Sequence, residues 1–89
     1  MDVRRFEDTL RAEGFGELET KSVAAGTHND EHSHPFEVRA LVLEGRIALT
    51  VNGATRSYSQ GEVFTMAAGC RHVEDVGQEG VRYLVGRRR

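Results

Sequence analysis

The spacing of apolar residues changes once along the chain, near Gly16. Before that point apolar residues recur every three to four positions, which is the period of a helix. Asp2 is placed to cap the start of this helix and Gly14 to end it. We therefore predict a helix over residues 2–13. Its apolar stripe, formed by Val3, Phe6 and Leu10, is narrow, so the helix should lie on the outside of another element.

After Gly16 the chain breaks into short segments with strand-like composition, separated by glycine or by Asn-Gly. Strands are predicted over residues 17–25, 32–34, 38–43, 46–51, 55–59, 62–66, 72–76 and 81–85. The intervening turns are expected at 26–31, 44–45, 52–53, 60–61 and 77–80. Among these, Asn52-Gly53 is the strongest hairpin signal, because a type I′ turn needs positive φ at both positions.

Seven or eight short strands without helices between them predict an all-β fold, a small antiparallel β-barrel or sandwich with one short N-terminal helix. We expect one domain overall, with the helix in residues 1–15 and the barrel in residues 16–89. The strand 38–43 is apolar on both faces, so its outer face must also be covered. The N-terminal helix, a second sheet or a second copy of the chain would each serve.

The charge balance excludes some classes of partner. The 89 residues carry 12 Lys and Arg against 14 Asp and Glu. No basic strip runs through the chain, which argues against nucleic-acid binding. The cluster Arg87 to Arg89 is interpreted as a solvated C-terminus.

Segment composition also bears on location. No apolar run approaches the roughly 20 residues that a membrane helix needs, and the N-terminus has no apolar segment typical of a secretion signal. Cys70 is the single cysteine, so an intramolecular disulfide is excluded. These features predict a cytoplasmic protein without a membrane partner.

Histidines provide the candidate chemistry. His32 and His34, two of the four histidines, lie two positions apart just before the longest apolar run. In a strand such residues face the same side, about 6.6–7 Å apart along the chain. Two imidazoles at that spacing can reach one metal ion.

Two motifs resemble those of the cupins. Gly26, His32 and His34 followed by Leu43-Glu44-Gly45 are similar to the first cupin motif, G-x5-H-x-H-x3-4-E-x6-G. Gly61 followed by Ala67-Ala68-Gly69-Cys70-Arg71-His72 is similar to the second, G-x5-P-x-G-x2-H-x3-N. The resemblance covers residues 17–86 and implies a small jelly-roll barrel, often a homodimer, that holds a divalent metal ion with three histidines and a glutamate.

Carried over residue by residue, the resemblance implies that His32, His34 and His72 bind the metal. The ion would be a divalent transition metal such as Zn, Fe, Ni or Mn. The chain departs from the motifs at three positions, Val38, Ala67 and Val76. Val38 matters most, because it stands where the motif has its glutamate ligand.

Three nearby side chains are candidates to compensate for Val38. Glu37 is one residue early and faces the opposite side unless a bulge turns it inward. His28 would lie about 13 Å from His32 in a continuous strand, too far to share an ion unless the chain turns between them. Glu74 shares the parity of His72, and we expect it to orient a ligand histidine.

Other polar and aromatic residues receive structural interpretations. Cys70 is expected to be a turn thiol and Arg71 a solvated loop charge. The core or cavity lining is assigned to Phe36, Phe64, Met66 and Tyr83.

Two functions remain open at this stage. One is a metal-dependent enzyme with dioxygenase- or isomerase-like chemistry on a small molecule. The other is a non-catalytic barrel that binds or senses a small ligand. Fold alone does not decide between them, and no catalytic residue is indicated.

Overall fold

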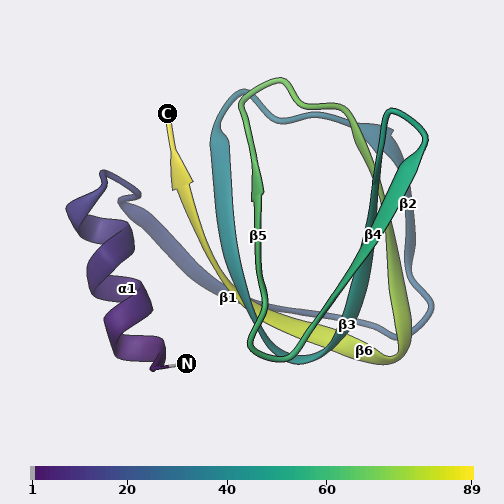
Figure 1. Cartoon of the computed structure of the whole chain (residues 1–89), viewed down its shortest axis with the longest axis horizontal. Coiled ribbons are helices and arrows are strands. Elements are labelled where there is room, and N and C mark those ends of the chain that lie inside the picture. Colours follow the sequence, from purple (N-terminus) through teal and green to yellow (C-terminus); the bar gives the residue numbers. More distant parts are fainter. Residues whose placement is uncertain (1) are drawn as a thin grey trace.

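The computed structural model describes residues 2–89, so Met1, the first residue of the predicted 1–15 segment, lies outside the described residues. One helix, α1 (Val3–Ala12), precedes six strands (Figure 1). The strands are β1 (Glu17–Val23), β2 (His28–His32), β3 (Glu37–Val51), β4 (Ala54–Ser59), β5 (Val63–Met66) and β6 (His72–Arg88). Each strand pairing among these residues is antiparallel, which confirms the predicted fold class.

Two long strands, β3 and β6, organise the fold. The first part of β3 lies between β5 and the second part of β6, which also pairs with β1. The second part of β3 lies between β4 and the first part of β6, which also pairs with β2. Two four-stranded layers thus share the same two strands, as in a jelly roll. The hydrogen-bonded order β1-β6-β3-β4 does not close into a complete barrel.

Two predicted turns are wrong. The chain does not reverse at residues 44–45 or 77–80; instead β3 and β6 continue through these positions. Register irregularities flank Gly45, where β3 passes very close to β6. Gly45 has a φ of 80°, and a Cβ built on it would lie 1.9 Å from the carbonyl oxygen of Gly80. The glycines that suggested turns therefore permit the register shift and the close approach of the two paired strands. The eight predicted segments become six strands.

Other local predictions are confirmed or corrected. Asn52 and Gly53 have φ of 51° and 79°, as the type I′ hairpin between β3 and β4 requires. The stretch 26–31 was predicted to be a turn, but β2 begins within it and pairs with β6 with an irregular register between Asn29 and His32. Arg87 and Arg88 belong to β6 rather than to a solvated terminus, and they pair with Glu19 and Glu37.

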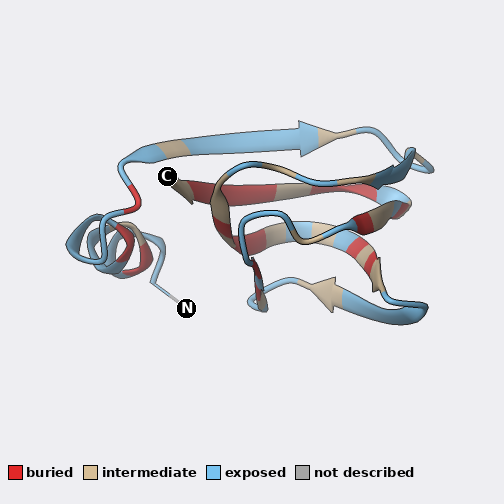
Figure 2. Cartoon of the chain, turned by 90° about the horizontal axis from the view of Figure 1, so that it is seen from above, coloured by how far each residue is buried: buried red, intermediate tan, exposed pale blue. Residues whose placement is uncertain are grey.

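The main core fills the space between the two layers. Figure 2 shows buried positions along β3 and β6, whereas most of β1 and β4 is exposed. The buried residues of this core are Val38, Ala40, Val42, Ile47, Leu49, Phe64, Met66, Val76, Val81, Tyr83 and Val85.

The helix covers the outer face of one layer. A second cluster joins Phe6, Leu10 and Phe15 to Leu41 of β3 and Leu84 of β6. Asp2 caps α1 as predicted, since its Oδ1 accepts hydrogen bonds from the amides of Arg4 and Arg5 at 2.9 and 3.3 Å. The outer face of strand 38–43 is therefore covered by the helix, and the homodimer stays a prediction. Within residues 2–89, no helix has the length and apolarity to cross a bilayer.

Candidate metal centre

The structure brings the three predicted histidines together. His32 ends β2, His72 begins β6, and the two are directly paired across the strands. His34 lies in the connection between β2 and β3. One ligand nitrogen from each imidazole lies within 4.8 Å of the others. Three histidines from segments about 40 positions apart in sequence thus form a cluster that could hold a metal ion.

Backbone carbonyls orient two of the rings. His32 Nδ1 donates to the carbonyl of Asp30 at 2.7 Å, and His72 Nδ1 donates to the carbonyl of Cys70 at 3.0 Å. Because a carbonyl only accepts, each Nδ1 carries a proton, and in the neutral imidazole each Nε2 then keeps a free lone pair. This is the arrangement in which histidine binds metals, with its second nitrogen held by an outer partner.

His34 is held differently. Its ring stacks on Phe36, with centroids 5.1 Å apart and an angle of 11° between the planes. Burial lowers the pKa of His34, and positive charge on His32 or His72 would lower it further. A neutral imidazole can coordinate a cation, whereas a protonated one cannot.

The buried nitrogen of His72 is the sharpest feature of the cluster. The side chain of His72 has an exposed fraction of 0%. Its Nε2 is the one buried side-chain N or O atom in residues 2–89 without a hydrogen-bond partner. Leaving such an atom unpaired costs about 1–3 kcal/mol. Three converging nitrogens, one of them orphaned, fit a divalent transition metal ion.

The carboxylates near the cluster have separate roles. Glu37 points to Arg88, whose Nε and Nη2 donate to Glu37 Oε1 at 3.0 and 2.8 Å, so no bulge turns it inward. Glu74 points to the cluster, with Oε2 at 3.3 Å from His72 Nε2 and 3.9 Å from His32 Nε2. The inward parity predicted for Glu74 is confirmed.

His28 takes no part in the cluster. Its Nδ1 lies 2.6 Å from Asp75 Oδ1 and its Nε2 lies 2.8 Å from Asp30 Oδ1. Both carboxylates raise the pKa of His28, chiefly through the hydrogen bond to Asp75. As predicted, His28 does not approach the other three histidines closely enough to share an ion.

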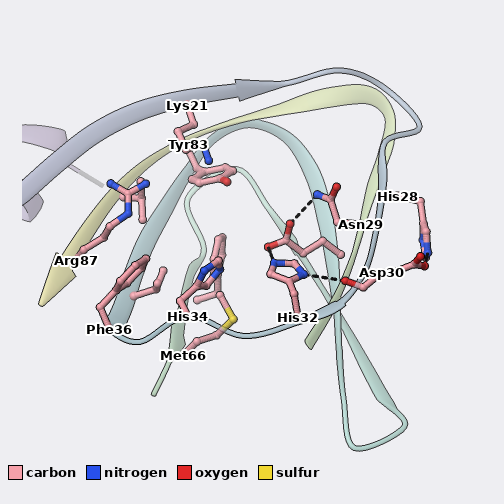
Figure 3. Close-up of a pocket in the computed structure, with 14 residues that line it drawn as sticks. Lys21, His28, Asn29, Asp30, His32, His34, Phe36, Met66, Tyr83 and Arg87 are labelled. Atoms are coloured by element: carbon pink, nitrogen blue, oxygen red, sulfur yellow. Dashed lines mark hydrogen bonds and ion pairs between the residues drawn. The ribbon is translucent and has the colours of Figure 1, made fainter. Parts of the chain in front are cut away.

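Two of the histidines, His32 and His34, line a cavity of about 530 Å³ between the layers together with Glu74, whereas the fully buried His72 is not among its lining residues (Figure 3). The apolar wall of the cavity is formed by Phe36, Val38, Phe64, Met66 and Val85. Val38 thus presents an apolar surface where the motif has a glutamate. Lys21, Tyr83 and Arg87 add polar groups to the same cavity, and burial raises the pKa of the Tyr83 hydroxyl.

The sequence analysis missed two of these polar residues. Arg87 was assigned to a solvated tail, although the alternation from Val81 through Tyr83 and Val85 places it on the inward face. Lys21 lies in β1, and the mixed composition of this strand does not indicate which of its two faces points inward. Cys70 and Arg71 have the predicted structural roles. Cys70 offers its carbonyl rather than its thiol to the cluster, and Arg71 pairs with Glu31 at 2.9 Å.

The sequence model of the Cupin domain matches residues 20–85. The chain belongs to the cupin family. No curated protein matches this cupin in sequence. Solved structures do resemble it, and they agree with the jelly-roll fold predicted from the two motifs.

Three of these structures show which kinds of protein share the fold and how similar they are to this chain. A protein of unknown function from Rhizobium leguminosarum has a TM-score of 0.75 and 21% identity, over 80% of this chain and 67% of that one. The polyketide cyclase RemF from Streptomyces resistomycificus has a TM-score of 0.68 and 27% identity, over 79% and 52%. Oxalate decarboxylase from Bacillus subtilis, a protein with Mn(II) centres, has a TM-score of 0.71 and 18% identity, over 80% and 20%. The aligned part of this cupin is thus about half of the cyclase and a fifth of the decarboxylase.

Proposed function

We propose that this cupin binds a divalent transition metal ion through His32, His34 and His72 and uses it in a reaction of a small molecule. The observation that carries the proposal is the buried, unpartnered Nε2 of His72, which faces a second imidazole with a free Nε2. The proposed reaction class is dioxygenase- or isomerase-like. A bound ion would supply a Lewis acid that polarises an oxygen atom of the substrate.

The surrounding residues support a small, partly anionic substrate. The cavity volume of about 530 Å³ lies within the range of small-molecule sites. Lys21 and the guanidinium of Arg87 line it, and Arg87 is already oriented by Glu19 at 3.2 Å. A carboxylate on the substrate would pair with these cations while its carbon skeleton contacts Val38, Phe64 and Val85. The Tyr83 hydroxyl, whose pKa is raised by burial, would stay protonated and could donate a hydrogen bond to the substrate.

Metal binding is tested first. The chain is purified without added metal, its metal content is measured, and Zn(II), Fe(II), Ni(II) and Mn(II) are then titrated into the metal-free protein. We expect one ion per chain and loss of binding in His72→Ala. His28→Ala is the matched control, because His28 lines the cavity without joining the cluster. If none of the ions binds or raises the melting temperature, the proposal is wrong.

Catalysis is tested separately. The metal-loaded protein is incubated with a panel of small carboxylic acids, with oxygen consumption and product mass as readouts. The apolar wall at Val38 favours an alternative, a non-catalytic barrel that only binds a small ligand. Turnover that disappears in His72→Ala would exclude this alternative. Binding of a panel member without turnover would favour it.

A further inference from the structure

The cluster lacks an anionic ligand at the position where the motif has one, since Val38 contributes only an apolar surface. Three neutral imidazoles would leave the charge of a divalent ion uncompensated in a partly buried cavity. Lys21 and Arg87 line the same cavity and add positive charge to it. A carboxylate close to the ion would offset this charge.

Glu74 lies on the metal-facing side of the histidines. The outer nitrogens of His32 and His72 are already bound to the carbonyls of Asp30 and Cys70. The Glu74 carboxylate instead approaches the Nε2 atoms, the atoms that would bind an ion. The orienting role predicted for Glu74 from the sequence is thus filled by the backbone.

The distances suit two ligands of one ion. Metal–ligand bonds of about 2.0–2.2 Å place adjacent ligand atoms about 3.0–3.4 Å apart and opposite ones about 4.2 Å apart. Glu74 Oε2 lies 3.3 Å from His72 Nε2, which is the separation of adjacent ligands. It lies 3.9 Å from His32 Nε2, a value between the adjacent and opposite separations. No hydrogen bond joins Glu74 to His72, because His72 Nε2 has no hydrogen-bond partner.

The carboxylate is also held in place. Asn29 Nδ2 donates to Glu74 Oε1 at 2.9 Å, which leaves Oε2 directed at the histidines. Asn29 and Glu74 are directly paired between β2 and β6, so the backbone fixes their separation. Glu74 is only 15% exposed. A carboxylate that binds a metal with one oxygen is typically held in place by a hydrogen bond to its other oxygen.

From these contacts we infer that Glu74 is a direct fourth ligand of the metal ion, and that it replaces the carboxylate missing at Val38. The inference rests on the proposed metal site. His72-Val73-Glu74 would then place two ligands two positions apart on β6, as His32-Ser33-His34 does before β3. The ion would be held by three nitrogens and one carboxylate oxygen, with the remaining positions open toward the cavity.

The test uses Co(II), whose visible absorption bands depend on the atoms bound to it. Metal-free wild type, Glu74→Gln and Glu37→Gln are titrated with Co(II), and both the affinity and the spectrum are recorded. Glu37→Gln is the matched control, because Glu37 is paired with Arg88 away from the cluster. Far-ultraviolet circular dichroism and melting in a chelator show that each variant is folded.

We expect Glu74→Gln to bind Co(II) about 10–100-fold more weakly than wild type and to shift the absorption bands. Glu37→Gln should match wild type in both readouts. An unchanged spectrum in folded Glu74→Gln, with or without weaker affinity, would overturn direct ligation while leaving the three-histidine site intact. Wild type that binds no Co(II), Zn(II) or Fe(II) would instead contradict the proposed function itself.

Discussion

Gly45 and Gly80 approach each other closely where the register of the two long paired strands, β3 and β6, shifts. A Cβ on Gly45 would lie 1.9 Å from the Gly80 carbonyl oxygen, and both residues have positive φ. This contact lets β3 and β6 each contribute to both layers, and it thereby places β2 and the start of β6 next to the cavity.

Replacing Gly45 tests the contact. Gly45→Ala should destabilise the fold more than Gly53→Ala, a glycine with a similar φ of 79° but no atom within 4 Å of a built Cβ. The positive φ alone should lower the free energy of unfolding of each variant by about 1–2 kcal/mol, because alanine adopts this conformation less readily than glycine. The clash at Gly45 should add about 1–3 kcal/mol or prevent folding. Urea unfolding measures the difference, and equal losses would contradict the close approach of Gly45 to Gly80.

The helix is expected to stabilise the fold without affecting the site. Leu10→Ala should lower the free energy of unfolding by about 2–5 kcal/mol, because Leu10 is 0% exposed in the outer cluster. Val3→Ala is the control and should change it by less than about 0.5 kcal/mol, since Val3 is 40% exposed. Chemical unfolding gives both values. Metal affinity should stay unchanged in each folded variant, and a loss in Leu10→Ala would indicate coupling between the helix and the cavity.

His28 is expected to make stability depend on pH. Its pKa is raised above the ordinary histidine value of 6.5, chiefly by the hydrogen bond to Asp75 and then by that to Asp30. The folded state therefore holds this proton more tightly than the unfolded state, and the stabilisation is complete below pH 6.5. It is lost as the pH rises through the higher folded pKa. The melting temperature of wild type should exceed that of His28→Gln in acid, and the difference should shrink as the pH rises from about 6.5 through the raised folded pKa of His28.

These scans are made in a chelator so that no metal contributes. His34, whose pKa is lowered by burial, changes stability in the opposite direction. Because both proteins contain His34, its effect cancels in the difference. If the difference in melting temperature between wild type and His28→Gln stays constant or widens as the pH rises, the two carboxylates do not stabilise the protonated form of His28.

Asn29 is expected to influence the metal through Glu74. Asn29→Ala removes the donor that holds Glu74 Oε1 at 2.9 Å. Metal affinity should fall about tenfold, which is the lower end of the effect of an outer hydrogen-bond partner. The Co(II) spectrum should keep its band positions, because the ligand atoms stay the same. Isothermal titration with Zn(II) measures the affinity, and an unchanged value would indicate that Glu74 needs no support from Asn29.

The sequence predicted those parts of the protein that local spacing determines. His32 and His34 are two positions apart, and His72 was identified by its match to the second cupin motif. Strand parity placed Glu74 inward. The Asn52-Gly53 hairpin and the Asp2 cap depend on neighbouring backbone atoms and were predicted for the same reason.

The remaining features depend on contacts between distant residues. Gly45 and Gly80 look like turn residues until it is known that two long strands pair and shift register there. Arg87 follows the inward alternation of β6, but its charge and its place near the chain end suggested solvent. Glu74 faces the Nε2 atoms of His32 and His72 because the backbone carbonyls of Asp30 and Cys70 already bind their Nδ1 atoms. Backbone contacts of this kind cannot be recognised from the order of side chains.

The position of β2 has a consequence for folding kinetics. β2 is short and mostly exposed, and its pairing with β6 joins His32 to a residue 40 positions later with an irregular register. Because this pairing buries so little area, we expect it to form after the pairing of β3 with β6. An ion shared by His32 and His72 would therefore be bound only after the transition state. Metal should slow the unfolding of this protein while leaving its folding rate unchanged.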